Sequence, residues 1–214
     1  SFNCWARRVS QEIVLRSAKA MVEKGLINYG WSYINIDDNW QGVRGGKYNA
    51  IQPNSQFQDM KVLADQIHAM GLKIGIYSAP FVGTYGGQIG STSDNEDGSY
   101  EWIKTGKHNK TYEIADPEGK IKSGYAFLYH GKYSFVKNDV KQFGDWDIDY
   151  LKYDWAPNDY YYTKEMHDAL RELDRDVVYS LSNNAPIADA AVYGEFANCW
   201  RTTGDLHDSW ESMS

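Results

Sequence analysis

The chain has few cysteines, no long apolar run and no excess of basic residues. Among its 214 residues only Cys4 and Cys199 are cysteines, and neither has the Cys/His spacing of a zinc site. Two unpaired thiols are the simpler interpretation of this pair, and a single disulfide is the alternative. The cysteine count therefore does not fix the redox compartment.

Other absences narrow the classes of function. No apolar run reaches the roughly 18 residues of a membrane span, so no membrane partner is expected. The net charge is -7 and the basic residues are scattered, which argues against nucleic acid, because phosphates need a basic surface. The histidines form no metal-binding motif, and we expect neither a metal nor a cofactor.

Two properties are left undetermined by the sequence. The N-terminus shows no signal-peptide pattern. The sequence is also compatible with a secreted or periplasmic protein whose signal peptide is not part of the chain, so it does not indicate the compartment. The oligomeric state is not indicated either.

What the chain does contain is a regular alternation of short apolar strands and amphipathic helices. Helices are expected at 10–24, 60–70, 135–146, 160–173 and 187–197, and strands at 33–37, 73–78, 149–154, 177–181 and 199–203. This order indicates a parallel sheet covered by helices, either as an open doubly wound sheet or as a (β/α)8 barrel. No glycine-rich phosphate loop follows the first strand, which disfavours a nucleotide-binding doubly wound fold.

The predicted fold class is α/β, as a (β/α)8 TIM barrel that is incomplete. Five complete strands are expected, with another before Phe2 and two after Ser214, so that about six of eight βα units would be present. Residues 1–214 would form one partial catalytic domain. Residues 83–132 lack a long periodicity and are expected to form a loop excursion at the barrel mouth, with or without a small hairpin.

Two aspartates directly follow predicted strands and are candidate catalytic groups. In a barrel, Asp154 and Asp205 would both lie at the carboxyl-terminal end of the strands. Two carboxyl groups are the smallest set that can cleave a glycosidic bond, one as nucleophile and one as proton donor. Lys152 alternates with Asp154, so its ammonium would keep this nucleophile ionised, and a buried ion pair without function is the alternative. Asp205 would be the proton donor, for which we expect desolvation, and a loop salt bridge with Arg201 is the alternative.

A further acidic pair ends the first predicted strand. Asp37 and Asp38 precede Trp40, and adjacent carboxylates can accept hydrogen bonds from neighbouring sugar hydroxyls. A solvated turn pair is the alternative interpretation. The chain is also rich in aromatic residues, with 17 Tyr and 8 Trp, and those at strand ends are candidates for stacking on sugar rings.

Several runs together resemble the melibiase family, glycoside hydrolase family 27, which includes α-galactosidases and α-N-acetylgalactosaminidases. The runs that carry the resemblance are Tyr33–Trp40, Gly71–Ser78, Asp149–Asp154 and Trp200–Asp205. The resemblance implies a (β/α)8 catalytic domain, and the β-sandwich domain that follows it in the family is expected to be absent from this chain. It also implies a retaining exo-α-galactosidase that acts on a galactose-containing oligosaccharide or glycoconjugate without a cofactor.

The resemblance further implies roles for particular residues. Asp154 would be the nucleophile and Asp205 the acid/base, and the substrate-binding residues would be Phe2, Asp37, Asp38, Tyr77, Lys152 and Arg201. Ser182 and Ala185 match the small pair of relatives that accept an N-acetyl group, although Asn183-Asn184 replaces their Trp-Pro. The alternatives are therefore an α-N-acetylgalactosaminidase and a non-catalytic carbohydrate-binding barrel fragment.

Two departures from the family pattern are informative. Many relatives carry a disulfide where this chain has Tyr85 and Ala156, so that bridge cannot form here. Asp147 stands where relatives usually have glycine, just after a predicted helix. We therefore predict a left-handed backbone conformation at Asp147.

Overall fold

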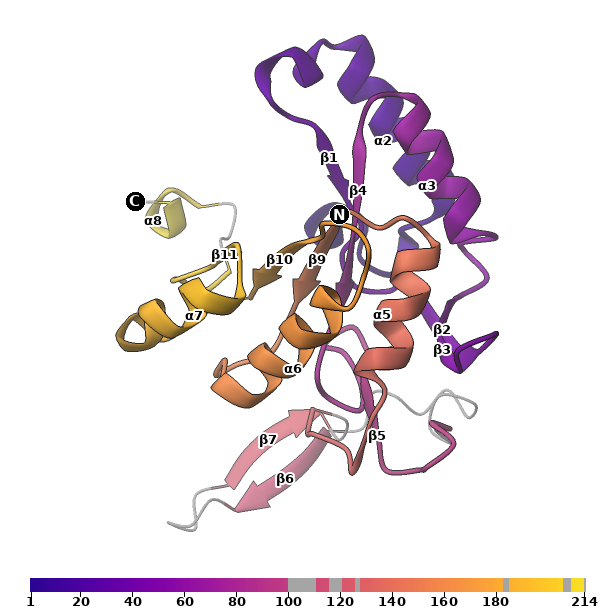
Figure 1. The fold of residues 1–214 in the computed structure, drawn as a ribbon. Helices are drawn as coiled ribbons and strands as arrows, with labels where there is room; N and C mark the ends of the chain where they lie inside the picture. The colour runs from indigo at the N-terminus through magenta and orange to yellow at the C-terminus, as the bar shows by residue number, and fades with distance from the viewer. Residues whose placement is uncertain (100–110, 116–120, 126–127, 183–184, 206–208, 214) are drawn as a thin grey trace.

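A parallel sheet forms the centre of the molecule, for which we use a computed structural model that describes residues 1–99, 111–115, 121–125, 128–182, 185–205 and 209–213 (Figure 1). The strands of this sheet are, in spatial order, β1 (Tyr33–Asn35), β4 (Lys73–Ser78), β9 (Tyr150–Tyr153), β10 (Val178–Leu181) and β11 (Cys199–Trp200). All neighbouring pairs are parallel. The order follows the sequence without the reversal that defines a doubly wound sheet, so the predicted α/β class is confirmed and the doubly wound alternative is excluded.

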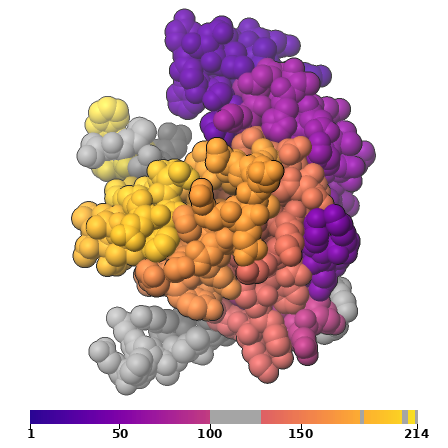
Figure 2. Space-filling model, in the orientation of Figure 1, coloured from indigo at the N-terminus to yellow at the C-terminus, as the bar shows by residue number. Residues whose placement is uncertain are grey.

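Helices precede or connect the strands and cover the sheet. Helix α2 (Gln11–Glu23) precedes β1, and successive sheet strands are connected by α3 (Met60–Ala69), α5 (Val136–Asp145), α6 (Tyr160–Arg171) and α7 (Ala190–Phe196). Helix α5 packs against α6 and α6 against α7, and the three form one continuous surface in sequence order (Figure 2). The helices and sheet strands expected from the sequence are present, with ends that differ by a few residues.

Side-chain caps fix where three of these helices begin. Ser10 Oγ accepts a hydrogen bond from the Ile13 amide at 3.3 Å, before α2. Asp59 and Asp159 cap α3 and α6 in the same way, each at 3.0 Å. Such caps satisfy amide groups that the first helical turn leaves without a backbone partner.

The structure also contains an antiparallel pair that the sequence did not predict. Strand β2 (Gln41–Gly45) pairs with β3 (Ala50–Pro53) between β1 and α3. A buried ion pair between Arg44 and Asp139 joins this hairpin to α5. Short helices complete the described residues: α1 (Phe2–Trp5), α8 (Trp210–Met213) and 3₁₀ turns at 6–8, 26–29 and 187–189.

The segment between β4 and α5 extends beyond the ends of β4 and β9 (Figure 1). It contains β5 (Thr92–Ser93), which pairs with β8 (Tyr133–Ser134), and an antiparallel pair of β6 (Thr111–Ala115) with β7 (Ile121–Tyr125). The Ser78 and Ser91 hydroxyls, 2.9 Å apart, tie its beginning to β4. Among the helices of the described residues, none has the length and apolar character needed to cross a membrane.

Candidate active site

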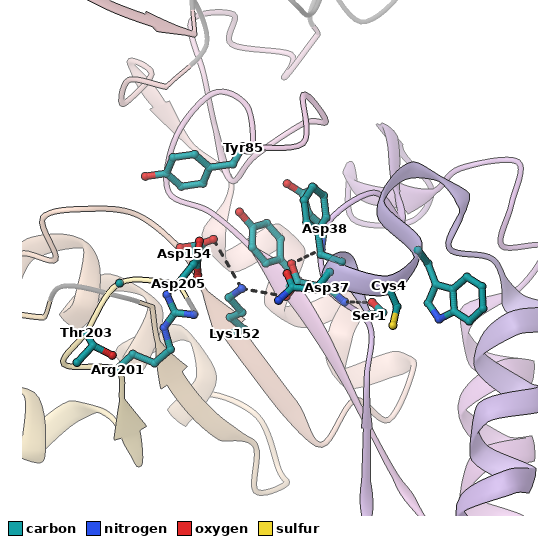
Figure 3. Close-up of a pocket in the computed structure, with 15 residues that line it drawn as sticks. Ser1, Cys4, Asp37, Asp38, Tyr85, Lys152, Asp154, Arg201, Thr203 and Asp205 are labelled. Carbon is teal, nitrogen blue, oxygen red and sulfur yellow. Dashed lines mark hydrogen bonds and ion pairs between the residues drawn. The ribbon is translucent and has the colours of Figure 1, made fainter. Parts of the chain in front are cut away.

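A cavity of about 700 Å³ lies at the carboxyl ends of the sheet strands (Figure 3). It brings together eight of the predicted site residues: Phe2, Asp37, Asp38, Tyr77, Lys152, Asp154, Arg201 and Asp205. Asp37 and Asp38 follow β1, Lys152 and Asp154 come from β9 and its end, and Arg201 to Asp205 follow β11. These positions meet because parallel strands present their carboxyl ends at one edge.

Lys152 pairs with two of the carboxylates that line the cavity. Its Nζ atom lies 2.9 Å from Asp37 Oδ2 and 3.8 Å from Asp154 Oδ2, so one ammonium group connects two carboxylates from different strands (Figure 3). The same atom lies 5.1 Å from the centre of the Tyr77 ring, which is a cation–π distance. The predicted pairing of Lys152 with Asp154 is therefore present, and Asp37 shares it.

Asp154 lies in a mostly dehydrated environment, with 13% of its side chain exposed. Burial raises the pKa of its carboxyl, and Lys152, Ser182 and Tyr77 act in the opposite direction. The sequence argument considered only the ammonium of Lys152, which favours the ionised form. In the structure burial is the larger effect, because desolvation penalises the charged carboxylate.

Asp38 has a different environment from its neighbour Asp37. Its carboxylate accepts hydrogen bonds from Thr84 Oγ1 at 2.7 Å and from the Gly86 amide at 2.6 Å. Burial nevertheless raises the pKa of Asp38 to about 6. Asp38 thus both lines the cavity and holds the loop of residues 84–86 in place.

Arg201 and Asp205 form the salt bridge that the sequence analysis had named as an alternative. Arg201 Nη2 donates to Asp205 Oδ1 at 2.7 Å, and 70% of the Asp205 side chain is exposed. The desolvation expected for Asp205 is therefore wrong for this structure. The reason is geometric, since Asp205 lies on an irregular segment after β11, at the edge of the described sheet.

Ser182 and Ala185 are not among the residues that line the cavity. Both are buried, and Ser182 Oγ accepts a hydrogen bond from the Trp155 amide at 3.0 Å and donates to the Trp155 carbonyl at 2.9 Å. The Ser182 hydroxyl therefore supports the backbone directly after Asp154. Their predicted role in choosing the sugar stays a prediction. It gains no support from their buried position outside the cavity.

The cavity also contains residues that the sequence analysis did not select: Ser1, Asn3, Cys4, Trp5, Tyr85, Thr203 and Gly204. Tyr85 could have been found from the family resemblance, which implies a disulfide between its position and that of Ala156 in many relatives, because bridged residues lie within about 7 Å of each other. Tyr85 must therefore approach the residues just after Asp154. Among the described residues, no group of three or more His, Cys, Asp or Glu side chains could hold a metal ion.

Comparison with known proteins gives one consistent family. A family described as "Alpha galactosidase A" matches residues 3–107 and 114–214. An alpha-galactosidase of Coffea arabica is 31% identical over the whole chain, and alpha-galactosidase A of Cellvibrio japonicus is 31% identical over 98% of it. The crystal structure of alpha-galactosidase I from Mortierella vinacea has a TM-score of 0.73 at 27% identity, covering 97% of this chain.

The chain spans about half the length of these relatives. It covers 48% of the coffee protein, 43% of the Cellvibrio protein and 45% of the Mortierella chain. The family match contains every residue that lines the cavity except Ser1 and Phe2.

Proposed function

The chain belongs to the alpha-galactosidase A family, and we propose that it carries the active site of a retaining exo-α-galactosidase. One observation supports this most directly: Asp154 and Asp205 line the same cavity as the cluster of Lys152 and Asp37. Paired carboxylates in one cavity provide a nucleophile and a proton donor. The ion-paired group beside them can bind the hydroxyls of a terminal galactose.

The proposed reaction has two steps. In the first, an Asp154 carboxylate oxygen bonds to the anomeric carbon while the glycosidic bond breaks and its oxygen takes the proton of Asp205. In the second, Asp205 removes a proton from water, the water oxygen attacks the anomeric carbon, and the bond to Asp154 breaks. The galactose leaves with its original anomeric configuration, because two inversions have occurred.

The fold supports the same proposal at the level of architecture. A parallel sheet whose strands follow one another without reversal is the arrangement of a (β/α)8 barrel, in which active sites lie at the carboxyl ends of the strands. We take residues 1–214 as about six of eight βα units of such a catalytic domain. We take the described part of residues 83–132 as the loop excursion at its mouth, while residues 100–110, 116–120 and 126–127 lie outside the described residues. The cavity residue Tyr85 comes from its beginning.

The exposure of Asp205 favours a second candidate function, a carbohydrate-binding domain without turnover. A proton donor has to remain protonated near neutral pH, whereas Asp205 is largely exposed and paired with Arg201. The cavity would then hold a galactoside but cleave it slowly or not at all. Selectivity for N-acetylgalactosamine has less support, since Ser182 and Ala185 do not reach the cavity.

Aryl glycosides distinguish these functions. We would screen nitrophenyl α-galactoside, α-N-acetylgalactosaminide and β-L-arabinopyranoside, with Asp154→Ala as the inactive control. The proposal expects preferred turnover of the α-galactoside, with a burst of nitrophenol if breakdown of the covalent intermediate is slow. Binding of galactose by the protein without release of nitrophenol would instead establish the binding function.

A further inference from the structure

Tyr85 is a cavity residue that has no part in the proposed reaction. Its side chain lines the cavity and is 39% exposed. Its ring contacts Phe81 edge-on, with the ring centres 6.4 Å apart. A phenol therefore reaches the cavity from the segment that follows β4.

The backbone on both sides of Tyr85 is held by one buried carboxylate. Thr84 Oγ1 donates to Asp38 Oδ1 at 2.7 Å, and the Gly86 amide donates to Asp38 Oδ2 at 2.6 Å. A Cβ atom at Gly86 would lie 2.8 Å from Asp38 Oδ2, so the loop and the carboxylate fit closely. Asp38 thus fixes the point from which the Tyr85 side chain projects.

The hydroxyl of Tyr85 is a hydrogen-bond donor at neutral pH. Burial raises the pKa of Tyr85 to about 12, and the charges of Asp154 and Asp205 add to the increase. The backbone at Ala156 lowers the pKa by a smaller amount. The hydroxyl therefore keeps its proton at neutral pH and can donate one hydrogen bond.

The two tyrosines of the cavity lie at different ends of it. The acidic groups that raise the pKa of Tyr77 are Asp38, Asp154 and Asp37, which lie at the inner, Lys152 end. Those that act on Tyr85 are Asp154 and Asp205. In the close-up, Asp154 lies between Tyr85 and Lys152 (Figure 3). Tyr85 therefore belongs to the outer end, where the bond to be cleaved and the leaving group would lie.

We propose that Tyr85 is a specificity-determining residue whose hydroxyl donates a hydrogen bond to the leaving-group sugar, and that Asp38 holds it in position through Thr84 and Gly86. This inference rests on the proposed function, because it takes Asp154 and Asp205 as the two sides of the cleaved bond. It gives Asp38 a positioning role in addition to any contact with the galactose.

The test compares a galactosyl disaccharide with nitrophenyl α-galactoside, which lacks sugar hydroxyls in its leaving group. Tyr85→Phe should lower kcat/KM for the disaccharide about five- to tenfold, the value of one neutral hydrogen bond, and change the aryl substrate less than twofold. Thr84→Val should shift the ratio of the two substrates in the same direction, because it loosens the Asp38 contact. Tyr129→Phe is the matched control, since Tyr129 is similarly exposed, at 41%, and does not line the cavity.

Equal losses on both substrates, or none on the disaccharide, would overturn the inference without contradicting the proposed α-galactosidase function. If the unmodified protein hydrolyses neither substrate, the proposed catalytic function fails and calorimetry tests Tyr85 separately. Tyr85→Phe should then weaken binding of the disaccharide several-fold and leave the affinity for free galactose unchanged. The same affinity for the disaccharide in both proteins would refute the role of Tyr85.

Discussion

Arg44 and Asp139 form a buried ion pair, and substituting one partner should lower the unfolding free energy much more than substituting the other. The side chains are 2% and 0% exposed, and Arg44 Nη2 lies 3.1 Å from Asp139 Oδ2. The pair joins the β2–β3 hairpin to α5, with further hydrogen bonds from the Ile51 amide to Asp139 and from Arg44 to the Gly90 carbonyl. Removing either partner leaves a charged group in a dry site.

The two charges differ in how they can respond. In Asp139→Asn the guanidinium of Arg44 cannot lose its proton, so the full cost of an unpaired buried charge remains, about 3–5 kcal/mol of unfolding free energy. In Arg44→Met the carboxyl of Asp139 can take up a proton. Burial already raises its pKa, and Arg44 is the main effect that opposes the increase. Loss of Arg44 therefore favours the neutral form, and the cost falls to about 1–3 kcal/mol at low pH.

Urea unfolding at about pH 5 and pH 8 measures this difference. A raised folded-state pKa stabilises the protein below the unfolded-state value and loses that contribution as the pH rises through the folded value. Arg44→Met should therefore become more destabilised, relative to the unmodified protein, between pH 5 and pH 8. Lys137→Met on the same helix is the control, because its pair with Glu172 is exposed and should contribute little to stability at either pH.

The reasoning would be refuted by an Arg44→Met variant that is as unstable as Asp139→Asn at pH 5. It would be refuted equally if both variants lay within about 1 kcal/mol of the unmodified protein. The first result would mean that Asp139 does not relieve its buried charge by taking up a proton when Arg44 is lost. The second would mean that the pair is hydrated in solution and that its charges are screened.

Three further predictions concern single aspartates. Asp154→Ala and Asp205→Ala should each lower kcat on an α-galactoside about 10²–10⁴-fold. In the unmodified protein the two carboxyl groups should lie about 5–5.5 Å apart, and NMR should show a product that retains the anomeric configuration. An inverted product contradicts the mechanism. For Asp38 the rise of the pKa from 3.8 to about 6 predicts that Asp38→Asn gains about 2–2.5 kcal/mol of unfolding free energy relative to the unmodified protein between pH 4 and pH 7, measured by urea unfolding; a flat difference contradicts it. Asp147→Gly should raise the unfolding free energy by about 1 kcal/mol, because Asp147 has a φ of 58°, which glycine adopts without strain. The measurement uses 1 M salt, which screens the exposed ion pairs that Asp147 forms. A decrease in high salt argues against this.

Local patterns predicted the parts of the fold that depend on local chemistry. The spacing of Val136, Val140 and Phe143 predicted α5, and all three side chains are buried in the structure. The left-handed conformation predicted at Asp147 is confirmed by its φ of 58°. Most of the cavity was predictable too, because residues that follow parallel strands meet at one edge.

The features that the sequence did not reveal depend on contacts between distant residues. The β2–β3 hairpin contains Gly42 and Gly45, which favour strands poorly, and it is held by Arg44 contacting Asp139 from another element. The environment of Asp154 depends on how completely other segments cover it, and the sequence shows only that Lys152 is near. A pattern along one segment cannot predict such burial, because burial is a property of several segments together.

The environments of the two proposed catalytic carboxylates are the reverse of what their roles require. Asp154 has to be ionised but is buried, and Lys152 is the group that supports its charge. Asp205 has to be protonated but is exposed and paired with Arg201. A sugar in the cavity would alter both conditions, since it would exclude water from Asp205 and would bring hydroxyl donors to Asp154 and Asp37. In the proposed reaction the leaving-group sugar would lie nearest to Asp205, so the proposed contact with Tyr85 would help to create the dry environment that proton donation needs.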